Sequence, residues 1–316
     1  MIGIDVGGAN LKIVDGTRIH THYCPLWEGA PLVSFLTRYR PSTDTPAAVV
    51  MSGELADCFC DKSEGIAFIV NAVREVFPQA VFYGTDAAFH TGAVPELAAA
   101  NWLASADYLK DHYADAVLLD VGSTTTDIIP LSVFPDLKGM TDLMRLRKGY
   151  LLYTGILRTS IPALLRTVTI DGIPTPLSSE FFAISADAHL VLGHIKPDQY
   201  SCDTPDKKEK TATASMRRLA RVVCADLGEI GENGAVEIAE EFWDVQRNLI
   251  CNQVHRVMND SHASGIVTAG TGAALFAGEL GGIDLGKELG EVADALPAFA
   301  VKEVAGRSNF FSSPLP

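Results

Sequence analysis

The chain has 316 residues, of which 47% are hydrophobic and 20% charged, so it holds enough apolar material for one large domain or two closely joined lobes. Its formal net charge of −14 disfavours broad binding to nucleic acid or to an anionic membrane, because like charges repel. A phosphorylated ligand must therefore be held by a local site.

The six cysteines lie far apart along a chain that shows no signal-peptide pattern, which predicts reduced thiols in a cytoplasmic protein. Cys58 and Cys60 are too close together for ordinary zinc-ligand spacing, and no second pair accompanies them. No apolar run reaches the roughly 18 to 20 residues that span a bilayer, so we expect no membrane partner.

The N-terminal third reads as alternating strands and helices. Residues 2–6 (IGIDV) predict a strand that ends at a glycine pair, and residues 11–26 continue as strand, Asp-Gly turn and strand. Helical spacing follows at 32–39, 63–77 and 95–113, with strand-like runs at 47–52 and 80–84 between these segments. This alternation predicts an α/β lobe over residues 1–115.

The same plan restarts at residue 116, where AVLLDVGSTTTDIIPL again reads as strand, glycine turn and strand. The interval between Asp5 and Asp120 is the size of a lobe, so a duplicated domain with a second lobe over residues 116–316 is expected. Residues 136–215 break the α/β rhythm and predict an insertion that reaches the substrate. Helices at 216–230 and 236–259 and a strand-turn-helix at 265–278 follow, and the last helix is compatible with a return to the first lobe.

Both glycine turns suit phosphate binding, because a glycine-rich turn after a strand points backbone N–H groups into a concavity with little side-chain obstruction. The predicted phosphate-binding residues are Gly7, Gly8, Ala9, Asn10 and Lys12 in the first turn, and Gly122, Ser123, Thr124 and Thr125 in the second. A single Asp-x-Gly turn is common in proteins, whereas two copies at lobe spacing indicate a shared ligand.

Carboxylates stand at the strand ends beside these turns. Asp5 and Asp120 each close a hydrophobic strand, where a carboxylate can hold Mg²⁺ or its waters next to phosphates, and Asp127 adds a third candidate metal ligand. A third glycine turn, with Gly270 and Gly272, opens a helix after a buried strand and is either a ligand-binding helix N-terminus or a tight helix entry.

Together the three turns resemble the two phosphate motifs and the adenosine motif of the actin, heat-shock chaperone and sugar kinase superfamily. The resemblance implies an α/β fold of two ribonuclease-H-like (actin-like ATPase) lobes that face a cleft, with an insertion in the second lobe. It also implies Mg²⁺, and ATP or another nucleotide, as cofactors.

Within that superfamily the chain resembles the hydantoinase and oxoprolinase-like branch, and there the proteins associated with tetrahydromethanopterin-linked one-carbon transfer. The stretches that carry this resemblance are IGIDVGGANLK, MSGELADCFCDKSEGI, AAANWLASADYL, LLDVGSTTTDIIPL, YTGILRTSIPALL and SEFFAISADAHLVLG. The archaeal members imply a transferase that joins an aminomethyl-furanmethyl diphosphate to the phenol of γ-glutamyltyramine, or of a tyrosine analogue, and releases diphosphate.

Candidate catalytic residues follow from this chemistry. Glu54 or Asp57 can accept the phenolic proton, Lys62 can pair with diphosphate, and Asp86 is a second candidate base. Arg158 can grip a phosphate or a carboxylate of the substrate, and an ion pair with another acidic residue is the alternative. For the acidic candidates the alternatives are a solvated loop, a turn or a helix cap.

Two further features leave their roles open. Asp187 stands in an otherwise apolar helical stretch, where it is either partnered in the core or directed at substrate, with a slight preference for substrate. A basic run is either a solvated helix face or a means of drawing in an anionic substrate, and it comprises Lys207, Lys208, Lys210, Arg217, Arg218 and Arg221.

Three functions thus remain as hypotheses. They are the diphosphate-releasing transferase, an ATP-dependent kinase or hydantoinase-like amidohydrolase, and a non-catalytic nucleotide-binding protein that closes its lobes on the ligand. The expected partner is a small phosphorylated molecule, without nucleic acid, and a homo-oligomer is compatible with the sequence.

Overall fold

The computed structural model describes residues 1–40, 42 and 45–308 and contains two main sheets. The first sheet has the order β3-β2-β1-β4-β5-β6. Its strands are β1 (Ile2–Val6), β2 (Asn10–Asp15), β3 (Arg18–Tyr23), β4 (Ala47–Met51), β5 (Val81–Tyr83) and β6 (Phe89–His90). The strands β1 and β4 are parallel and wholly buried, as expected for strands covered on both faces.

The faces of β4 alternate between two cores, which follows from the two-residue period of a strand. Ala47, Val49 and Met51 pack with α1 (Leu32–Thr37) and α2 (Lys62–Val76). The intervening Ala48 and Val50 pack with α3 (Asn101–Leu109) and α12 (Leu296–Arg307).

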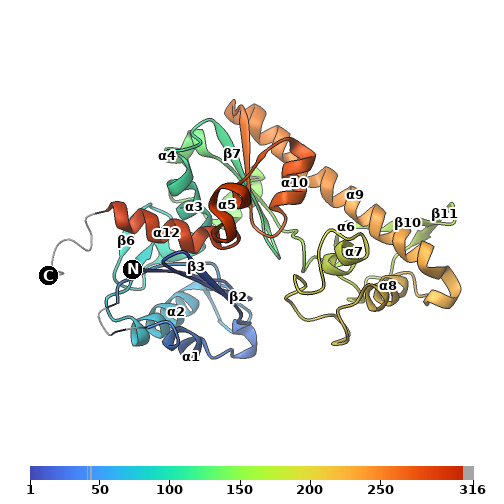
Figure 1. Cartoon of the computed structure of the whole chain (residues 1–316), viewed down its shortest axis with the longest axis horizontal. Coiled ribbons are helices and arrows are strands. Elements are labelled where there is room, and N and C mark those ends of the chain that lie inside the picture. Colours follow the sequence, from blue (N-terminus) through green and yellow to red (C-terminus); the bar gives the residue numbers. More distant parts are fainter. Residues whose placement is uncertain (41, 43–44, 309–316) are drawn as a thin grey trace.

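The second sheet repeats the plan of the first, with the order β13-β12-β7-β8-β9 (Figure 1). Its strands are β7 (Ala116–Val121), β8 (Thr126–Pro130), β9 (Leu151–Leu152), β12 (Gly265–Ala269) and β13 (Ile283–Asp284). In each sheet an antiparallel hairpin comes first, and its first strand pairs in parallel with a later strand, β4 or β12. The helices on or beside this sheet are α4 (Phe134–Leu137), α5 (Asp142–Lys148), α10 (Ala273–Leu280) and α11 (Leu285–Leu289).

The C-terminal helix α12 packs on β1 and β4 of the first sheet and on α3, which are elements distant from it in the sequence (Figure 1). The close approach to β1 depends on Gly3, because a Cβ at that position would lie 2.0 Å from the carbonyl oxygen of Ala298. The core beneath α3 and α12 includes residues of both sheets, such as Val50 and Leu118, and so joins the two lobes.

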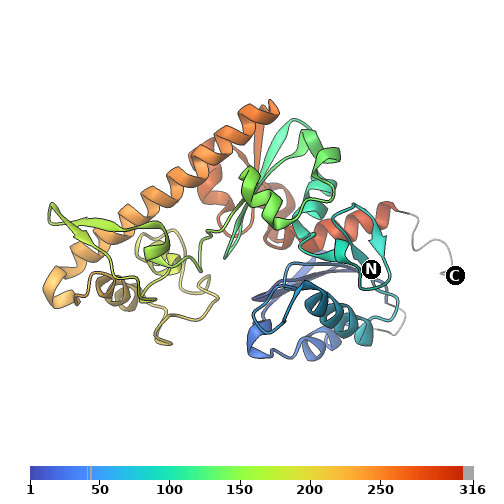
Figure 2. The ribbon, with the colours of Figure 1, turned by 180° about the vertical axis from the view of Figure 1, so that it is seen from behind.

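An arm extends from the second lobe on the side opposite the chain termini (Figure 1, Figure 2). It contains α6 (Ile161–Leu164), the hairpin of β10 (Thr167–Ile170) and β11 (Ile173–Pro176), α7 (Ser185–Val191) and α8 (Ala212–Arg221). The long helix α9 (Leu227–Ser261) connects the arm to the second sheet, since it contacts α7, α8 and β10 as well as β7 and β8. Gly231, with φ 66° and ψ 177°, kinks its first turns.

The boundaries differ from the sequence pattern in places. The strand β9 lies inside the predicted insertion 136–215 but pairs with β8, while α8 and the first part of α9 pack within the arm. The expected helix at 95–113 is a short 3-10 turn, η2 (Pro95–Leu97), followed by α3, because Ala99 adopts a left-handed φ of 48° and breaks the helix.

Other 3-10 turns are η1 (Leu26–Glu28), η3 (Leu131–Val133) and η4 (Gly290–Ala295). Among the described residues, no helix combines the length and the apolar composition needed to cross a bilayer. All six cysteines are free thiols.

Candidate active site

The two glycine turns have the same construction. In the first hairpin Asp5 pairs with Lys12, and in the second Asp120 pairs with Asp127, at equivalent register positions. The N–H of Gly7 donates to the Asn10 carbonyl at 2.9 Å, and the N–H of Gly122 donates to the Thr125 carbonyl at the same distance. The repeated sequence thus produces the same turn twice.

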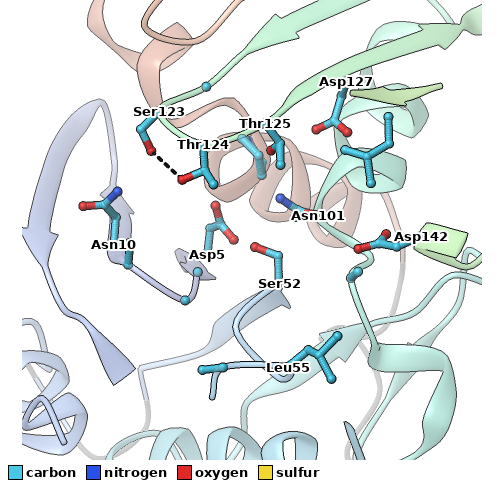
Figure 3. A pocket seen from close by; sticks show the side chains of 18 of the residues that line it. Asp5, Asn10, Ser52, Leu55, Asn101, Ser123, Thr124, Thr125, Asp127 and Asp142 are labelled. Carbon is cyan, nitrogen blue, oxygen red and sulfur yellow. Dashed lines mark hydrogen bonds between the residues drawn. The ribbon is translucent and has the colours of Figure 1, made fainter. Parts of the chain in front are cut away.

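The two turns line one cleft of about 610 Å³ (Figure 3). The predicted site residues in its lining are Asp5, Gly7, Gly8, Ala9, Asn10, Lys12, Glu54, Asp57, Asp120, Gly122, Ser123, Thr124, Thr125, Asp127 and Arg158. Lining residues that the sequence pattern missed are Trp27, Ser52, Leu55, Ala56, Ala99, Asn101, Asp142, Arg145, Leu151, Asp294 and Pro297. Ser52, Leu55 and Asn101 lie in stretches that carry the family resemblance, whereas Arg145 lies in none of them.

The strand-end carboxylates are held in an environment that disfavours their charge. Burial raises the pKa of Asp5 to about 6, although Lys12 opposes this shift. Burial, together with repulsion from Asp127, Asp5 and Asp294, raises the pKa of Asp120 to about 7. Lys12 donates from Nζ to the Asp294 carbonyl at 2.5 Å, and its charge also opposes the shift of Asp120.

One oxygen of Asp5 has no hydrogen-bond partner although the residue is only 7% exposed. A buried carboxylate oxygen without a partner indicates a place where a bound cation, or a hydrogen-bond donor of the ligand, would contact that oxygen. Mg²⁺ typically uses one or two carboxylates, with waters and phosphate oxygens completing its shell. Asp5 and Asp120 fit that requirement, and within the described ranges no set of three or more His, Cys, Asp or Glu side chains is arranged to hold a metal alone.

Asp127, predicted as a metal ligand, is engaged in an ion pair. Arg145 donates to its Oδ1 at 2.5 Å and to Asp142 Oδ1 at 2.6 Å, and the guanidinium lies over the Trp102 ring, 4.6 Å from the centroid. Arg145 is 3% exposed, so the cation is fixed in the wall of the cleft. It places a permanent positive charge beside the carboxylates of the second turn.

Glu54 is the most buried acidic side chain in the first lobe's part of the cleft, at 2% exposure, and its Oε2 has no hydrogen-bond partner. Burial raises its pKa, while backbone amides, including that of the strained Ala99, and the charge of Lys62 oppose the shift. The first turn of α2 packs directly against the backbone of Glu54. This close approach requires glycine at position 65, since a Cβ on Gly65 would lie 1.9 Å from the Glu54 carbonyl oxygen.

Two predicted catalytic residues lie outside the lining of the cleft. Lys62 starts α2 behind Glu54, near enough to affect its pKa. Asp86 is exposed in the turn between β5 and β6, where it accepts from the Ala88 N–H and pairs with His90 at 3.1 Å. The turn role considered as the alternative for Asp86 is therefore the observed one.

The third glycine turn serves close packing. Gly270 has φ 79°, and a Cβ there would lie 2.4 Å from Asp120 Oδ1. The N–H of Gly272 donates to the Val121 carbonyl at 2.9 Å, and a Cβ on Gly272 would lie 2.7 Å from the Val121 side chain. The turn packs tightly at the entry of α10 and supports the strand end that carries Asp120. Gly270 and Gly272 are not among the residues that line the cleft, and their binding role stays a prediction.

Asp187 is partnered in the core of the arm, so the preference for a substrate contact was wrong. It is fully buried and accepts from Arg218 and Ser215, each at 2.8 Å, and from Tyr200 at 3.2 Å. Arg218 is equally buried, and Arg221 pairs with Asp206 at 3.1 Å. Part of the basic run is therefore internal.

Comparison with known proteins supports the fold and identifies the family. The profile of the hydantoinase/oxoprolinase family matches residues 46–288. Among solved structures, a nucleotide-free acetone carboxylase, described in connection with ATP-dependent acetone carboxylation, has a TM-score of 0.52 at 9% identity, with 95% of this chain and 69% of that one covered. The expected α/β fold of the actin-like ATPase type is confirmed.

Two curated relatives share a name. The chain is 34% identical to the (4-{4-[2-(gamma-L-glutamylamino)ethyl]phenoxymethyl}furan-2-yl)methanamine synthase of Methanocaldococcus jannaschii, over 96% of this chain and 97% of that protein. It is 38% identical to a synthase of the same name from Methanococcus vannielii, over 51% of this chain and 73% of that protein. On the extent of these matches, the chain belongs to the hydantoinase/oxoprolinase family.

Proposed function

We propose that this protein is a transferase of methanofuran-type cofactor biosynthesis. It condenses (5-aminomethyl-3-furyl)methyl diphosphate with the phenol of γ-glutamyltyramine, or of a tyrosine analogue, and releases diphosphate. The near full-length relative named as a synthase supports the pathway. The observation that carries the reaction class is the cleft itself, in which two phosphate turns and an unpartnered buried carboxylate, Glu54, line the same space.

The reaction exchanges one carbon–oxygen bond for another. The phenol oxygen bonds to the exocyclic furfuryl carbon while the bond from that carbon to the diphosphate oxygen breaks, and the electron pair leaves with diphosphate. The phenolic proton passes to a base, so the products are an ether, diphosphate and a proton. The furan ring delocalises positive charge at the reacting carbon, so the protein's task is to stabilise the leaving group and to position the phenol.

The leaving group is assigned to the two glycine turns. Both turns line the cleft, one from each lobe, and the cations Lys12 and Arg145 lie in the same lining. The N–H groups of Gly7 and Gly122 close the turns, so the other N–H groups of the turns are the donors assigned to the phosphates. Asp5 and Asp120 are the residues that would hold Mg²⁺, which supplies charge neutralisation for diphosphate oxygens when bound. Carboxylates outnumber cations in this lining, so Mg²⁺ would be needed to offset their repulsion of diphosphate.

Glu54 is assigned as the base that accepts the phenolic proton. Its raised pKa makes it a better proton acceptor than an exposed carboxylate, and its buried Oε2 has no hydrogen bond to lose when a phenol O–H approaches. Asp57, the other predicted base, lines the cleft but is exposed.

The test uses purified protein, Mg²⁺, the furfuryl diphosphate and either γ-glutamyltyramine or its tyrosine analogue, with detection of diphosphate and ether. Ether with one diphosphate per turnover is the expected result. Glu54→Gln should lower kcat by about 100-fold or more, while binding of inorganic diphosphate changes little. Asp57→Asn, the matched loss of a nearby carboxylate, should change kcat by less than about threefold.

Three outcomes would contradict this assignment. ATP consumption without ether formation would support the kinase or amidohydrolase hypothesis. Nucleotide binding without turnover of any of these substrates would support a non-catalytic nucleotide-binding protein. Equal effects of Glu54→Gln and Asp57→Asn would remove Glu54 from the role of base.

A further inference from the structure

One contact in the lining of the cleft joins the two lobes. The guanidinium of Arg158, from the segment that follows β9, lies over the indole ring of Trp27 from the first lobe, 4.7 Å from the ring centroid. Both side chains are partly buried and both line the cleft. An arginine on the face of an aromatic ring is attracted by the ring's quadrupole and is also held in a restricted set of rotamers.

On the first lobe, the backbone next to Trp27 is fastened to the first phosphate turn. The N–H of Leu26 donates to the Gly8 carbonyl at 3.0 Å, and the N–H of Cys24 donates to the Ala9 carbonyl at 2.8 Å. Gly53 packs behind the same turn, where a Cβ would lie 2.9 Å from the Gly7 carbonyl. A movement of the first turn must therefore move the indole ring as well.

On the second lobe, Arg158 is fastened to the second phosphate turn in the same way. The N–H groups of Leu157 and Arg158 donate to the Ser123 carbonyl at 3.0 and 2.9 Å, and that of Ile156 donates to the Gly122 carbonyl at 3.0 Å. Gly155 lies against this turn too closely for any side chain, since a Cβ would be 2.6 Å from the Gly122 carbonyl oxygen.

The electrostatic surroundings leave Arg158 available to a ligand. None of the described carboxylates forms an ion pair with Arg158 within the usual distance limit, in contrast to Arg145, which has two such partners. The ion pair considered as the alternative for Arg158 is thus absent from the described part of the chain. The charge of Arg158 is held by an aromatic face, which does not neutralise it.

We propose that Trp27 is a positioning residue: it holds the Arg158 guanidinium over the cleft, ready for the outer phosphate of the ligand, and couples the two phosphate turns across the lobes. The inference rests on the proposed function in one respect, namely that the ligand carries a diphosphate. Arg158 makes the contact with the ligand. Trp27 acts through Arg158, because it restricts the arginine side chain before binding and so lowers the conformational entropy that is lost when the ligand binds.

The test is a double-mutant cycle on the affinity for inorganic diphosphate with Mg²⁺, measured by calorimetry. Arg158→Gln should weaken binding by about tenfold or more, because it removes a charge-assisted contact. Trp27→Leu should weaken binding by about two- to fivefold, the size of a partly exposed cation–π interaction. The double variant should bind no worse than Arg158→Gln alone, because Trp27 has no role once the arginine is absent.

Two controls separate positioning from loss of structure. Trp27→Phe keeps an aromatic face and should restore affinity to within about twofold of the wild type. Trp243→Phe changes a tryptophan of α9 that packs among His194 and Phe276, outside the cleft lining, and should leave diphosphate affinity unchanged. In the ether assay, Trp27→Leu should raise KM for the furfuryl diphosphate more than it lowers kcat.

The possible results distinguish the two proposals. Additive losses in the cycle, or a Trp27→Leu variant that binds like the wild type, would overturn the role of Trp27 while leaving the transferase intact. Coupled losses without ether formation would support the role of Trp27 and overturn the proposed reaction. A wild-type protein that does not bind diphosphate would overturn both.

Discussion

Replacing Asp5 by Asn should stabilise the protein without ligand and abolish its ligand binding. The substitution keeps the size of the side chain and removes the charge. Asp5 is 7% exposed, lies one residue before the end of the central strand β1 and has one oxygen without a hydrogen-bond partner. The folded chain therefore buries a carboxylate that it does not fully satisfy. Natural active sites carry such costs because the ligand compensates for them.

The magnitude follows from the pKa of Asp5. Burial raises it from 3.8 to about 6, a difference of roughly 2 units, and each unit corresponds to about 1.4 kcal/mol. The folded state binds the Asp5 proton more tightly than the unfolded state. The free-energy cost of burying the ionised carboxylate is therefore absent below pH 3.8, grows as the pH rises and is complete above pH 6. Asp5→Asn should therefore raise the free energy of unfolding by about 3 kcal/mol at pH 8 and by less than about 1 kcal/mol at pH 4.

Thermal unfolding of both proteins at pH 8 and pH 4 provides the measurement, and a rise in Tm of about 5 °C at pH 8 is expected. Asp15→Asn is the matched control, because Asp15 is exposed at the end of β2 in the same sheet and the charge change is identical. Addition of Mg²⁺ and diphosphate should raise the Tm of the wild type and of Asp15→Asn, but not that of Asp5→Asn. A destabilised Asp5→Asn protein, or a gain that is equal at both pH values, would refute the reasoning.

Three other predictions concern residues that do not line the cleft. Gly65→Ala should lower the free energy of unfolding by about 2 kcal/mol or more and reduce ether formation, because its Cβ would lie 1.9 Å from the Glu54 carbonyl oxygen. Gly92→Ala is the control, since a Cβ there meets nothing within 4 Å, and it should change neither quantity in the same unfolding and activity assays. Gln246→Leu should lower the free energy of unfolding by about 2–4 kcal/mol in urea denaturation. The fully buried amide donates to the Thr154 hydroxyl and the Gly155 carbonyl, each at 2.9 Å, and its removal leaves these buried partners unpaired; a loss below about 1 kcal/mol would contradict this. Asp86→Asn should keep kcat within about twofold of the wild type, and a large fall would make Asp86 a candidate base again.

Much of the fold is visible in the sequence because its signals are local. A hydrophobic strand followed by glycines forms the same turn wherever it occurs, so Asp5-Val6-Gly7 and Asp120-Val121-Gly122 are recognisable as equivalent from their residues alone. The hairpin pairings that place Asp5 opposite Lys12 and Asp120 opposite Asp127 follow from the same local chemistry. The prediction of one continuous helix at 95–113 was wrong because Ala99 adopts a left-handed backbone conformation. Alanine has no preference for that conformation, so it is imposed by the surrounding structure.

Local patterns of residues were enough to show that two equivalent strand-turn units exist and that carboxylates stand at their ends. The contacts between distant side chains became visible in the folded chain: Arg145 with Asp127, Arg158 with Trp27, and Asp187 with Arg218. The physical reason is that turns and strands arise from interactions between near neighbours, whereas charge pairing and burial depend on packing between segments far apart in the chain, which no local pattern records.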